Sequence, residues 1–318
     1  MADLTLDEVR DRLCIEDLHP LVGGASSLTY AGQLAGRRVV VKVAPAGIAP
    51  TGHRDVLRQC RIIKALGPTP VPVPEVLRED TGDPPGVPPL FVMSWVDGSS
   101  LEPLFDSDGA AATAVVAERF RRAAAVMAQL HRIPLTALGL EREPGVAADA
   151  EVERWCRALE TVDAALAPGW RDVSRALTNS VPAPLPHALI HGDFRLGNLL
   201  AVEDTITAVV DWEIWSVGDP RVDVGWFLIN SDPRTYRRAT PYVGNTPDVD
   251  ELASIYQAAL GVRAPDLGWF QALACFKSVA TWALIVKHNR RRSAPDPDLE
   301  SMSDTLPHLL SRALQLLG

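Results

Sequence analysis

The chain has 318 residues, of which 31 are basic and 40 are acidic, and a formal net charge of −9. This length corresponds to about two domains or lobes of ~100 to 200 residues each, which can bury a substantial core without disulfides. The 47% apolar and 22% charged residues are ordinary globular values and exclude a disordered or fibrous chain. Because acidic residues dominate, no positive field exists to attract nucleic acid or an anionic membrane, and neither is expected as a partner.

The cysteines and the first residues indicate a cytoplasmic protein. The four cysteines are scattered without a C-x-x-C pair, so reduced thiols are expected rather than a zinc or redox site. Asp3, Asp7 and Glu8 stand where a secretory signal would carry positive charge. The most apolar stretch, Trp269–Val286, is interrupted by polar side chains and is predicted to be a core helix rather than a membrane span.

Strand signals dominate the first part of the chain, residues 1–97, which is expected to form a small β-rich lobe. Leu28–Leu34, Arg37–Val43 and Leu90–Val96 have the β-branched and apolar composition of strands. One helix, Arg54–Leu66, is predicted because its apolar residues recur every three or four positions before a Gly-Pro stop.

Helical periodicity dominates the remaining chain, residues 98–318. A long helix beginning near Ser107 or Asp108 is predicted from apolar residues at helical spacing. Further helical segments are predicted at residues 152–166, 222–229, 252–260, 269–286 and 306–317, with short strands at 188–190, 199–202 and 206–210. The expected fold class is α+β, with a small β-rich N-terminal lobe and a larger helical C-terminal lobe.

Two short segments carry the candidate catalytic chemistry. In the first, His191-Gly192-Asp193-Phe194-Arg195-Leu196-Gly197-Asn198, a carboxylate and a carboxamide are five positions apart, and in the second Asp211 ends a strand. Magnesium binds through one or two carboxylates plus ligand phosphates, so Asn198 and Asp211 are the candidate metal ligands. Asp193 is then available to meet a substrate hydroxyl, although an aspartate in this position could also cap a turn.

These segments resemble the aminoglycoside phosphotransferase and choline kinase-like family, a branch of the protein-kinase-like fold. The family pattern H-G-D-x-x-x-x-N matches His191–Asn198, D-W-E matches Asp211–Glu213, and G-D-P-x-x-D matches Gly218–Asp223. The resemblance covers most of the chain, and three ordered motifs are far more specific than one. It implies a bilobal fold, ATP and Mg²⁺ as cofactors, Asp193 as the catalytic residue, and transfer of the γ-phosphoryl group to a small-molecule hydroxyl.

The resemblance also implies nucleotide-binding residues in the N-terminal lobe. A lysine within an apolar strand would pair the α and β phosphates, and a hairpin of small residues would cover them. The lobe connector would contact adenine through its backbone. The implied nucleotide-binding residues are Lys42, Gly24, Ser26, Ser27, Met93, Ser94 and Val96.

One position departs from the family pattern. Relatives commonly carry a glutamate on the N-terminal lobe helix to hold the lysine, whereas the aligned stretch here offers Gln59. A neutral amide can accept a hydrogen bond from Lys42 but forfeits the ion pair. Asp55, one helical turn earlier, is an alternative partner for the lysine.

Residues around the motifs are expected to have supporting roles. His191 is interpreted as a hydrogen-bonding scaffold, and Asp223 is expected to stabilise the catalytic loop rather than bind metal. Trp212, Trp215 and Trp226 are expected in the core rather than in a stacking platform.

Three functions are compatible with these patterns. The first is an ATP-dependent phosphotransferase whose acceptor lies within the range of the family: aminoglycosides, macrolides, choline-like alcohols, sugars or hydroxyacyl groups. The second is a nucleotide-binding pseudoenzyme or regulator, suggested by Gln59 and by a loop without G-x-G-x-x-G. The third is a metal-dependent hydrolase built on His191, Asp193 and Asp211. The sequence leaves the acceptor and the oligomeric state open.

Overall fold

The computed structural model describes residues 6–21, 27–47, 49–106 and 109–318. Contacts divide the chain into two compact units, which we describe separately. The N-terminal unit comprises Met1–Ser100, Thr136–Glu141 and Asn198–Trp215, and the C-terminal unit comprises Leu101–Leu135, Arg142–Gly197 and Ser216–Gly318. The chain therefore returns to the N-terminal unit for Asn198–Trp215, a return that the linear division at residues 97 and 98 does not contain.

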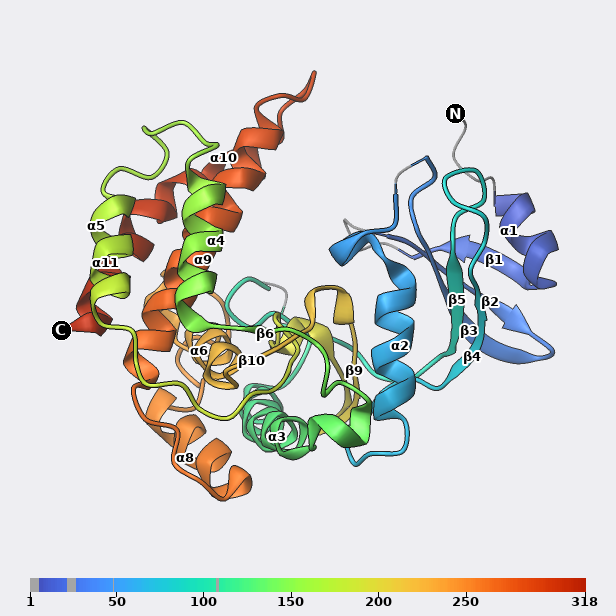
Figure 1. Cartoon of the computed structure of the whole chain (residues 1–318), viewed down its shortest axis with the longest axis horizontal. Coiled ribbons are helices and arrows are strands. Elements are labelled where there is room, and N and C mark those ends of the chain that lie inside the picture. Colours follow the sequence, from blue (N-terminus) through green and yellow to red (C-terminus); the bar gives the residue numbers. More distant parts are fainter. Residues whose placement is uncertain (1–5, 22–26, 48, 107–108) are drawn as a thin grey trace. The chain divides into compact units, whose positions relative to one another are not determined.

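The N-terminal unit is built on a five-stranded antiparallel sheet of order β1-β2-β3-β5-β4 (Figure 1). Its strands are β1 Glu16–Pro20, β2 Leu28–Leu34, β3 Arg37–Val43, β4 Val76–Asp80 and β5 Leu90–Ser94, and helix α1 Leu6–Leu13 precedes them. The predicted bounds of β2 and β3 are confirmed, and β5 ends two residues earlier than the predicted Val96. On β3 the side chains of Val39, Val41 and Val43 are fully buried, which anchors this strand in the core of the unit.

Helix α2 (Val56–Leu66) lies between β3 and β4 in the chain and packs on the sheet through contacts with β4 and β5. Asp55 is its N-cap, and its Oδ1 accepts hydrogen bonds from the backbone N–H groups of Leu57 (3.0 Å) and Arg58 (3.3 Å). The prediction began this helix at Arg54, but a 3₁₀ turn, η1 Gly52–Arg54, precedes the cap. The cap therefore fixes where the α-helix begins.

A two-stranded hairpin completes the N-terminal unit. Strands β8 (Leu199–Val202) and β9 (Thr205–Val209) pair with each other. Backbone hydrogen bonds join the hairpin to the first part of the unit. Val209 N donates to Pro72 O (2.8 Å), and Ser99 and Ala201 each donate to the other's carbonyl (2.9 and 3.1 Å). The candidate metal ligands Asn198 and Asp211 flank this hairpin, so they belong to the N-terminal unit although they are distant in sequence from its five-stranded sheet.

The C-terminal unit is mainly helical (Figure 1). Its helices are α3 Thr113–Arg132, α4 Ala148–Leu159, α5 Trp170–Asn179, α6 Arg221–Ile229, α7 Pro233–Tyr236, α8 Val249–Leu260, α9 Leu267–Asn289, α10 Pro297–Ser301 and α11 Leu306–Leu317. A small sheet joins β6 Gly145–Val146, β10 Ser216–Gly218 and β7 Ala188–Ile190, with β10 in the centre.

Two helix predictions in this unit need correction. Helix α3 begins at Thr113, whereas the expected start at Ser107 or Asp108 lies outside the described residues. The segment predicted as 152–166 is helical only to Leu159, and the chain then runs through turns and bends to Gly169.

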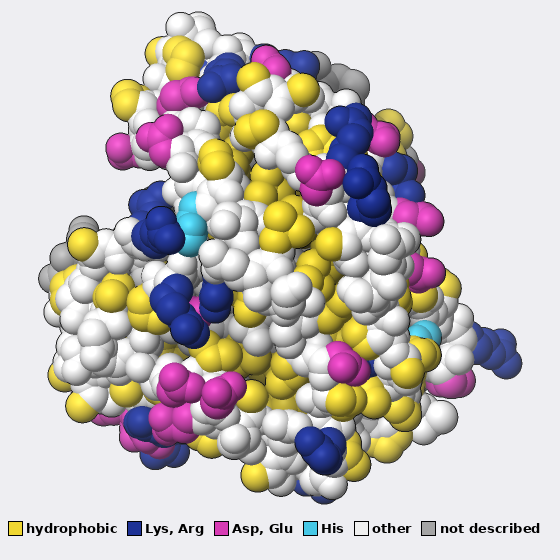
Figure 2. All heavy atoms as spheres, turned by 90° about the vertical axis from the view of Figure 1, so that its left-hand side faces the viewer, with side chains coloured by type: hydrophobic (Ala, Val, Ile, Leu, Met, Phe, Trp, Pro, Cys, Tyr) yellow, Lys and Arg dark blue, Asp and Glu magenta, His cyan; other side chains and the backbone are white. Residues whose placement is uncertain are grey.

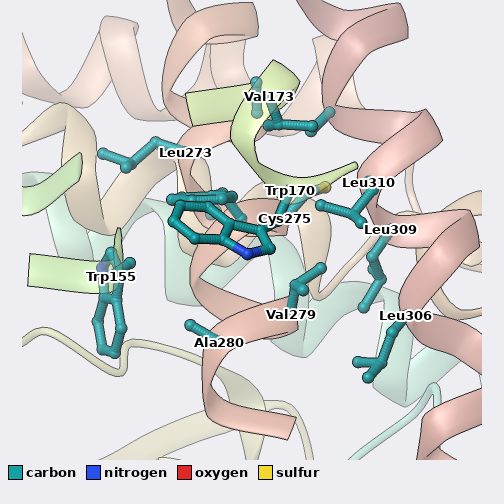
Figure 3. Packing of buried hydrophobic residues seen from close by; sticks show 14 of the residues in the cluster. Trp155, Trp170, Val173, Leu273, Cys275, Val279, Ala280, Leu306, Leu309 and Leu310 are labelled. Atoms are coloured by element: carbon teal, nitrogen blue, oxygen red, sulfur yellow. The ribbon is translucent and has the colours of Figure 1, made fainter. Parts of the chain in front are cut away.

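The core of the C-terminal unit surrounds α9, which packs against α4, α5, α6 and α11. Figure 3 shows Trp170, Val279 and Leu309 among the buried side chains of this cluster. Helix α9 is long and apolar enough to cross a membrane, but 83% of its most apolar window is buried inside the structure. This burial agrees with the prediction of a core helix.

Figure 2 shows basic and acidic side chains interspersed on the face that it presents, without a continuous basic area. This distribution accords with the net charge of −9.

Candidate active site in two parts

Lys42 is the centre of the site in the N-terminal unit. It projects from β3 and is largely buried, with 11% of its side chain exposed. Its Nζ donates to Asp211 Oδ1 at 2.9 Å and to Gln59 Oε1 at 3.1 Å. Gln59 therefore takes the position expected for a lysine partner, whereas Asp55 is engaged as the cap of α2. The buried cation is held by one charged and one neutral acceptor.

The two candidate metal ligands lie at the same end of the β8–β9 hairpin. Leu199 pairs with Val209, and the N–H of Val210 donates to the backbone carbonyl of Asn198 at 2.9 Å. Asp211 follows directly in the left-handed conformation, with φ of 65°. A carboxylate and a carboxamide at one hairpin end are the hard oxygen donors that suit Mg²⁺ when phosphates supply further ligands. Among the described residues, no three His, Cys, Asp or Glu side chains gather into a metal-binding group.

Helix α2 is tied to the segment that follows Asp211. The guanidinium of Arg58 lies 3.9 Å from the ring centroid of Trp215 and donates to its backbone carbonyl at 2.5 Å. The indole N–H of Trp215 donates in return to the carbonyl of Arg58 at 3.1 Å. Because Gln59 is the next residue on α2, this reciprocal contact joins the helix that carries Gln59 to the segment that follows Asp211.

The other implied nucleotide-binding residues are only partly described. Gly24 and Ser26 lie outside the described residues. Ser27 is buried, and its Oγ has no hydrogen-bond partner within the part of the chain that the structure describes.

At the end of β5, Met93 is buried, and Val96 is half-buried in the extended connector. The N–H of Ser94 donates to the carbonyl of Glu75 at 2.8 Å, and the Oγ of Ser94 accepts from the N–H of Glu75 at 2.9 Å. The N–H of Ser94 is therefore engaged within the protein. That backbone groups near Ser94 and Val96 contact adenine stays a prediction.

Asp193 is the centre of the site in the C-terminal unit. Its side chain is 23% exposed, so a solute can reach it. Its Oδ1 accepts a hydrogen bond from the indole N–H of Trp226 at 2.7 Å, and Arg195 Nε lies 3.0 Å from Oδ1 and 3.1 Å from Oδ2. Arg195 also forms an ion pair with Glu102. The carboxylate is thus oriented by two donors on different elements of the unit.

Asp223 fixes the backbone that carries Asp193. Its Oδ2 accepts from the N–H of His191 at 2.7 Å, and its Oδ1 accepts from the N–H of Gly192 at 2.8 Å. Burial acts to raise the pKa of Asp223, but the hydrogen bond and charge of His131 outweigh it and hold the pKa below the usual carboxyl value. These contacts confirm that Asp223 stabilises the loop.

The ring of His191 has the expected scaffold role. Its Nδ1 accepts a hydrogen bond from the N–H of Asp193 at 3.2 Å. The ring also lies edge-on to Phe194, with a centroid distance of 6.0 Å. The buried ring of His191 therefore stabilises the turn of the loop that carries Asp193.

Sequence reasoning missed two polar contributors to this part of the site. Trp226 was expected to be a core residue, and it is buried, but its N–H reaches Asp193. Lys277 on α9 donates to the carbonyl of Gly192 at 2.5 Å. A lysine inside an otherwise apolar helix was the available signal, because buried lysines are rare unless they are paired.

Comparison with known proteins places the chain among proteins of related fold. A Ralstonia eutropha protein provisionally named an aminoglycoside phosphotransferase superposes with a TM-score of 0.76 at 20% identity, covering 98% of this chain and 97% of that one. The macrolide 2'-phosphotransferase of Brachybacterium faecium gives a TM-score of 0.63 at 20% identity over 95% and 97% of the two chains. These likenesses establish the protein-kinase-like fold that the motifs predicted.

The relatives found by sequence are longer proteins than this chain. Acyl-CoA dehydrogenase family member 10 of Mus musculus is 28% identical over 81% of this chain, and family member 11 of Gallus gallus is 29% identical over 80%. The chain covers 25% and 34% of the lengths of these two relatives.

A family profile covers most of the sequence, from residue 17 to residue 273, and includes all three motifs. The match agrees with the fold and with the ordered motifs. The chain belongs to the phosphotransferase enzyme family.

Proposed function

We propose that this protein is an ATP-dependent phosphotransferase that moves the γ-phosphoryl group to a hydroxyl of a small molecule. The observation that carries the proposal is the pair of Lys42 Nζ and Asp211 Oδ1 at 2.9 Å, which joins residues 169 positions apart. Structural neighbours add support, since the aminoglycoside phosphotransferase APH(4)-Ia has been captured in a ternary complex with ADP and hygromycin B. That neighbour is 15% identical with a TM-score of 0.64.

Each residue has a defined task in this proposal. Phosphoryl transfer requires mainly alignment and charge neutralisation. Lys42 binds the α and β phosphates of the nucleotide, and Asn198 with Asp211 would hold Mg²⁺, which when bound neutralises phosphate charge. Asp193 orients the acceptor hydroxyl and accepts its proton, and Arg195 and Trp226 keep its carboxylate in one direction.

The acceptor is proposed only as a class, a small molecule bearing a hydroxyl. Hygromycin B is the acceptor-side ligand of one structural neighbour, whereas the sequence relatives are named after acyl-CoA dehydrogenases. An acceptor screen therefore includes an aminoglycoside, a macrolide, choline, sugars and hydroxyacyl thioesters. Mass detection of a phosphorylated product identifies the acceptor without assuming its chemistry.

The decisive test replaces Asp193 by Asn. We expect product formation with the identified acceptor to be lost, while calorimetric binding of ATP with magnesium is retained, because Asp193 belongs to the acceptor chemistry and Lys42 to the nucleotide. Asp298→Asn, an exposed position on α10, is the matched control and should leave both unchanged. Undiminished turnover in Asp193→Asn would refute the assignment, and nucleotide binding by the wild type without any product would favour a regulator.

A further inference from the structure

Lys277 has no task in the mechanism proposed above, although its position is unusual. It lies in the middle of α9, a long and mostly buried apolar helix, and only 9% of the residue is exposed. Its ammonium donates to the carbonyl of Gly192 at 2.5 Å and lies 3.9 Å from the ring centroid of Trp226. A buried cation thus contacts both the residue before Asp193 and the indole that binds Asp193.

The indole of Trp226 connects the two charges. Its face receives the ammonium of Lys277, while its N–H donates to Asp193 Oδ1 at 2.7 Å. A cation over an aromatic face attracts π density, and linked polar groups strengthen one another in a low-dielectric interior. The N–H is therefore a stronger donor to the carboxylate with Lys277 in place than without it.

Packing does not account for an ammonium at this position. Burial lowers the pKa of Lys277, which reports the cost of keeping the cation away from water, while the charge of Asp193 acts in the opposite direction. A methionine would fill a similar volume without that cost. The ammonium contributes instead a hydrogen bond to the loop and a charge beside the indole.

We infer that Lys277 is a positioning residue for Asp193, which it holds in direction through the Gly192 carbonyl and the Trp226 indole. The inference rests on the proposed role of Asp193 toward the acceptor hydroxyl. Asp223 accepts from the N–H of Gly192 and Lys277 donates to its carbonyl, so the residue before Asp193 is held at both of its backbone polar groups.

The kinetic test compares Lys277→Met with Trp226→Phe. Both should lower kcat roughly ten- to a hundredfold, because small displacements of a reacting group have effects of this size, while KM for ATP stays within about twofold. In the double variant the fold-decrease in kcat should be smaller than the product of the two single fold-decreases, because both residues act on Asp193 through one chain of contacts. Lys287→Met changes a half-buried lysine near the end of the same helix, whose Nζ donates to Thr161 Oγ1 at 3.0 Å; it is the control and should leave kcat unchanged.

A second measurement needs no turnover. The indole N–H resonance of Trp226, assigned by its disappearance in Trp226→Phe, should shift in Lys277→Met and in Asp193→Asn but not in Lys287→Met. An unshifted resonance in folded Lys277→Met would overturn the inference, as would a Lys277→Met kcat equal to that of the wild type.

The two proposals fail in different ways. A wild type that yields no product with any acceptor refutes the phosphotransferase proposal, and the indole shift then decides the contact chain alone. If Lys277→Met does not fold, Trp226→Phe decides, because it keeps an aromatic face for Lys277 and removes only the donor to Asp193. Unchanged kcat in folded Trp226→Phe overturns the inference.

Discussion

The two parts of the candidate site are held by different means. In the N-terminal unit, Lys42 is placed by a central strand and contacts one carboxylate and one neutral amide. In the C-terminal unit, the loop carrying Asp193 is fixed by a buried carboxylate, Asp223, and a buried cation, Lys277. Strand pairing fixes the first part and side-chain charge fixes the second, so the second depends more strongly on single side chains.

This difference corresponds to the proposed tasks. A nucleotide brings several phosphate charges of its own, which can complete the environment of Lys42 when it binds. A neutral acceptor hydroxyl brings no charge, so the protein must orient Asp193 in advance.

Asp223→Asn should be the most damaging change. The asparagine amide would present a donor where two backbone N–H groups already donate, and the loop would lose its buried charge. Removing one partner of such a buried network costs about 3 to 5 kcal/mol of unfolding free energy. Denaturant unfolding measures the loss, and Asp172→Asn, an exposed carboxylate paired with Arg175 at 3.5 Å, should change stability by less than ~1 kcal/mol. Equal effects of the two variants would contradict the importance of the buried network.

The stability contributed by Asp223 should depend on pH. Its folded pKa is lowered, so its contribution is fully present above the unfolded value of about 3.9 and is lost as pH falls through the folded value. The difference in unfolding free energy between the wild type and Asp223→Asn should therefore be constant from about pH 5 to 7 and shrink below about pH 4. A difference that grows with acid would contradict this sign.

Gln59→Leu should have a smaller effect, which should be confined to the binding of the nucleotide. It removes the neutral acceptor of Lys42 and leaves Asp211. A hydrogen bond to a charged group contributes about 1.5 to 3 kcal/mol, so ATP affinity should fall about tenfold or more, with kcat less affected. Calorimetry with ATP and magnesium measures it, and Gln33→Ala on β2 serves as the control. Unchanged affinity would show that Asp211 alone positions the lysine.

Replacing an exposed cysteine should have the smallest effect on the protein. The labelling rates of the buried cysteines compare how readily the cores of the two units open. Burial raises the pKa of Cys60 on α2 and of Cys275 on α9 to about 12, whereas Cys14 is exposed. At pH 8 a thiol reagent should modify Cys14 first, and Cys14→Ser should remove this fast phase. Fast labelling of Cys60 but not Cys275 would show that the N-terminal unit opens more readily.

The sequence predicted the elements whose signals are local. Strands β2 and β3 and helix α11 were predicted with their observed bounds, because alternation and apolar periodicity are properties of neighbouring residues. Helix α5 was missed because its apolar residues follow a Pro-Gly pair within a polar stretch. Short strands such as β10 owe their existence to pairing with distant partners, which no local pattern reveals.

The site divides in the same way. Ordered motifs identify Asp193, Asn198 and Asp211. The sequence also offers Gln59 as one of two alternative partners of Lys42. The roles of Trp226 and Lys277 depend on helices far along the chain meeting one loop, and no local pattern reveals that meeting. Sequence reasoning therefore identifies reactive groups more readily than the residues that orient them.

The return of Asn198–Trp215 to the N-terminal unit has a practical consequence for dissecting the protein. A fragment ending at Ser100 would lack the hairpin and Asp211, and would expose a lysine whose carboxylate partner had been removed. No single cut separates two self-sufficient pieces. Exchanging the helical C-terminal unit between relatives therefore requires at least three crossover points, one after Ser100 and one on each side of the returning segment Asn198–Trp215.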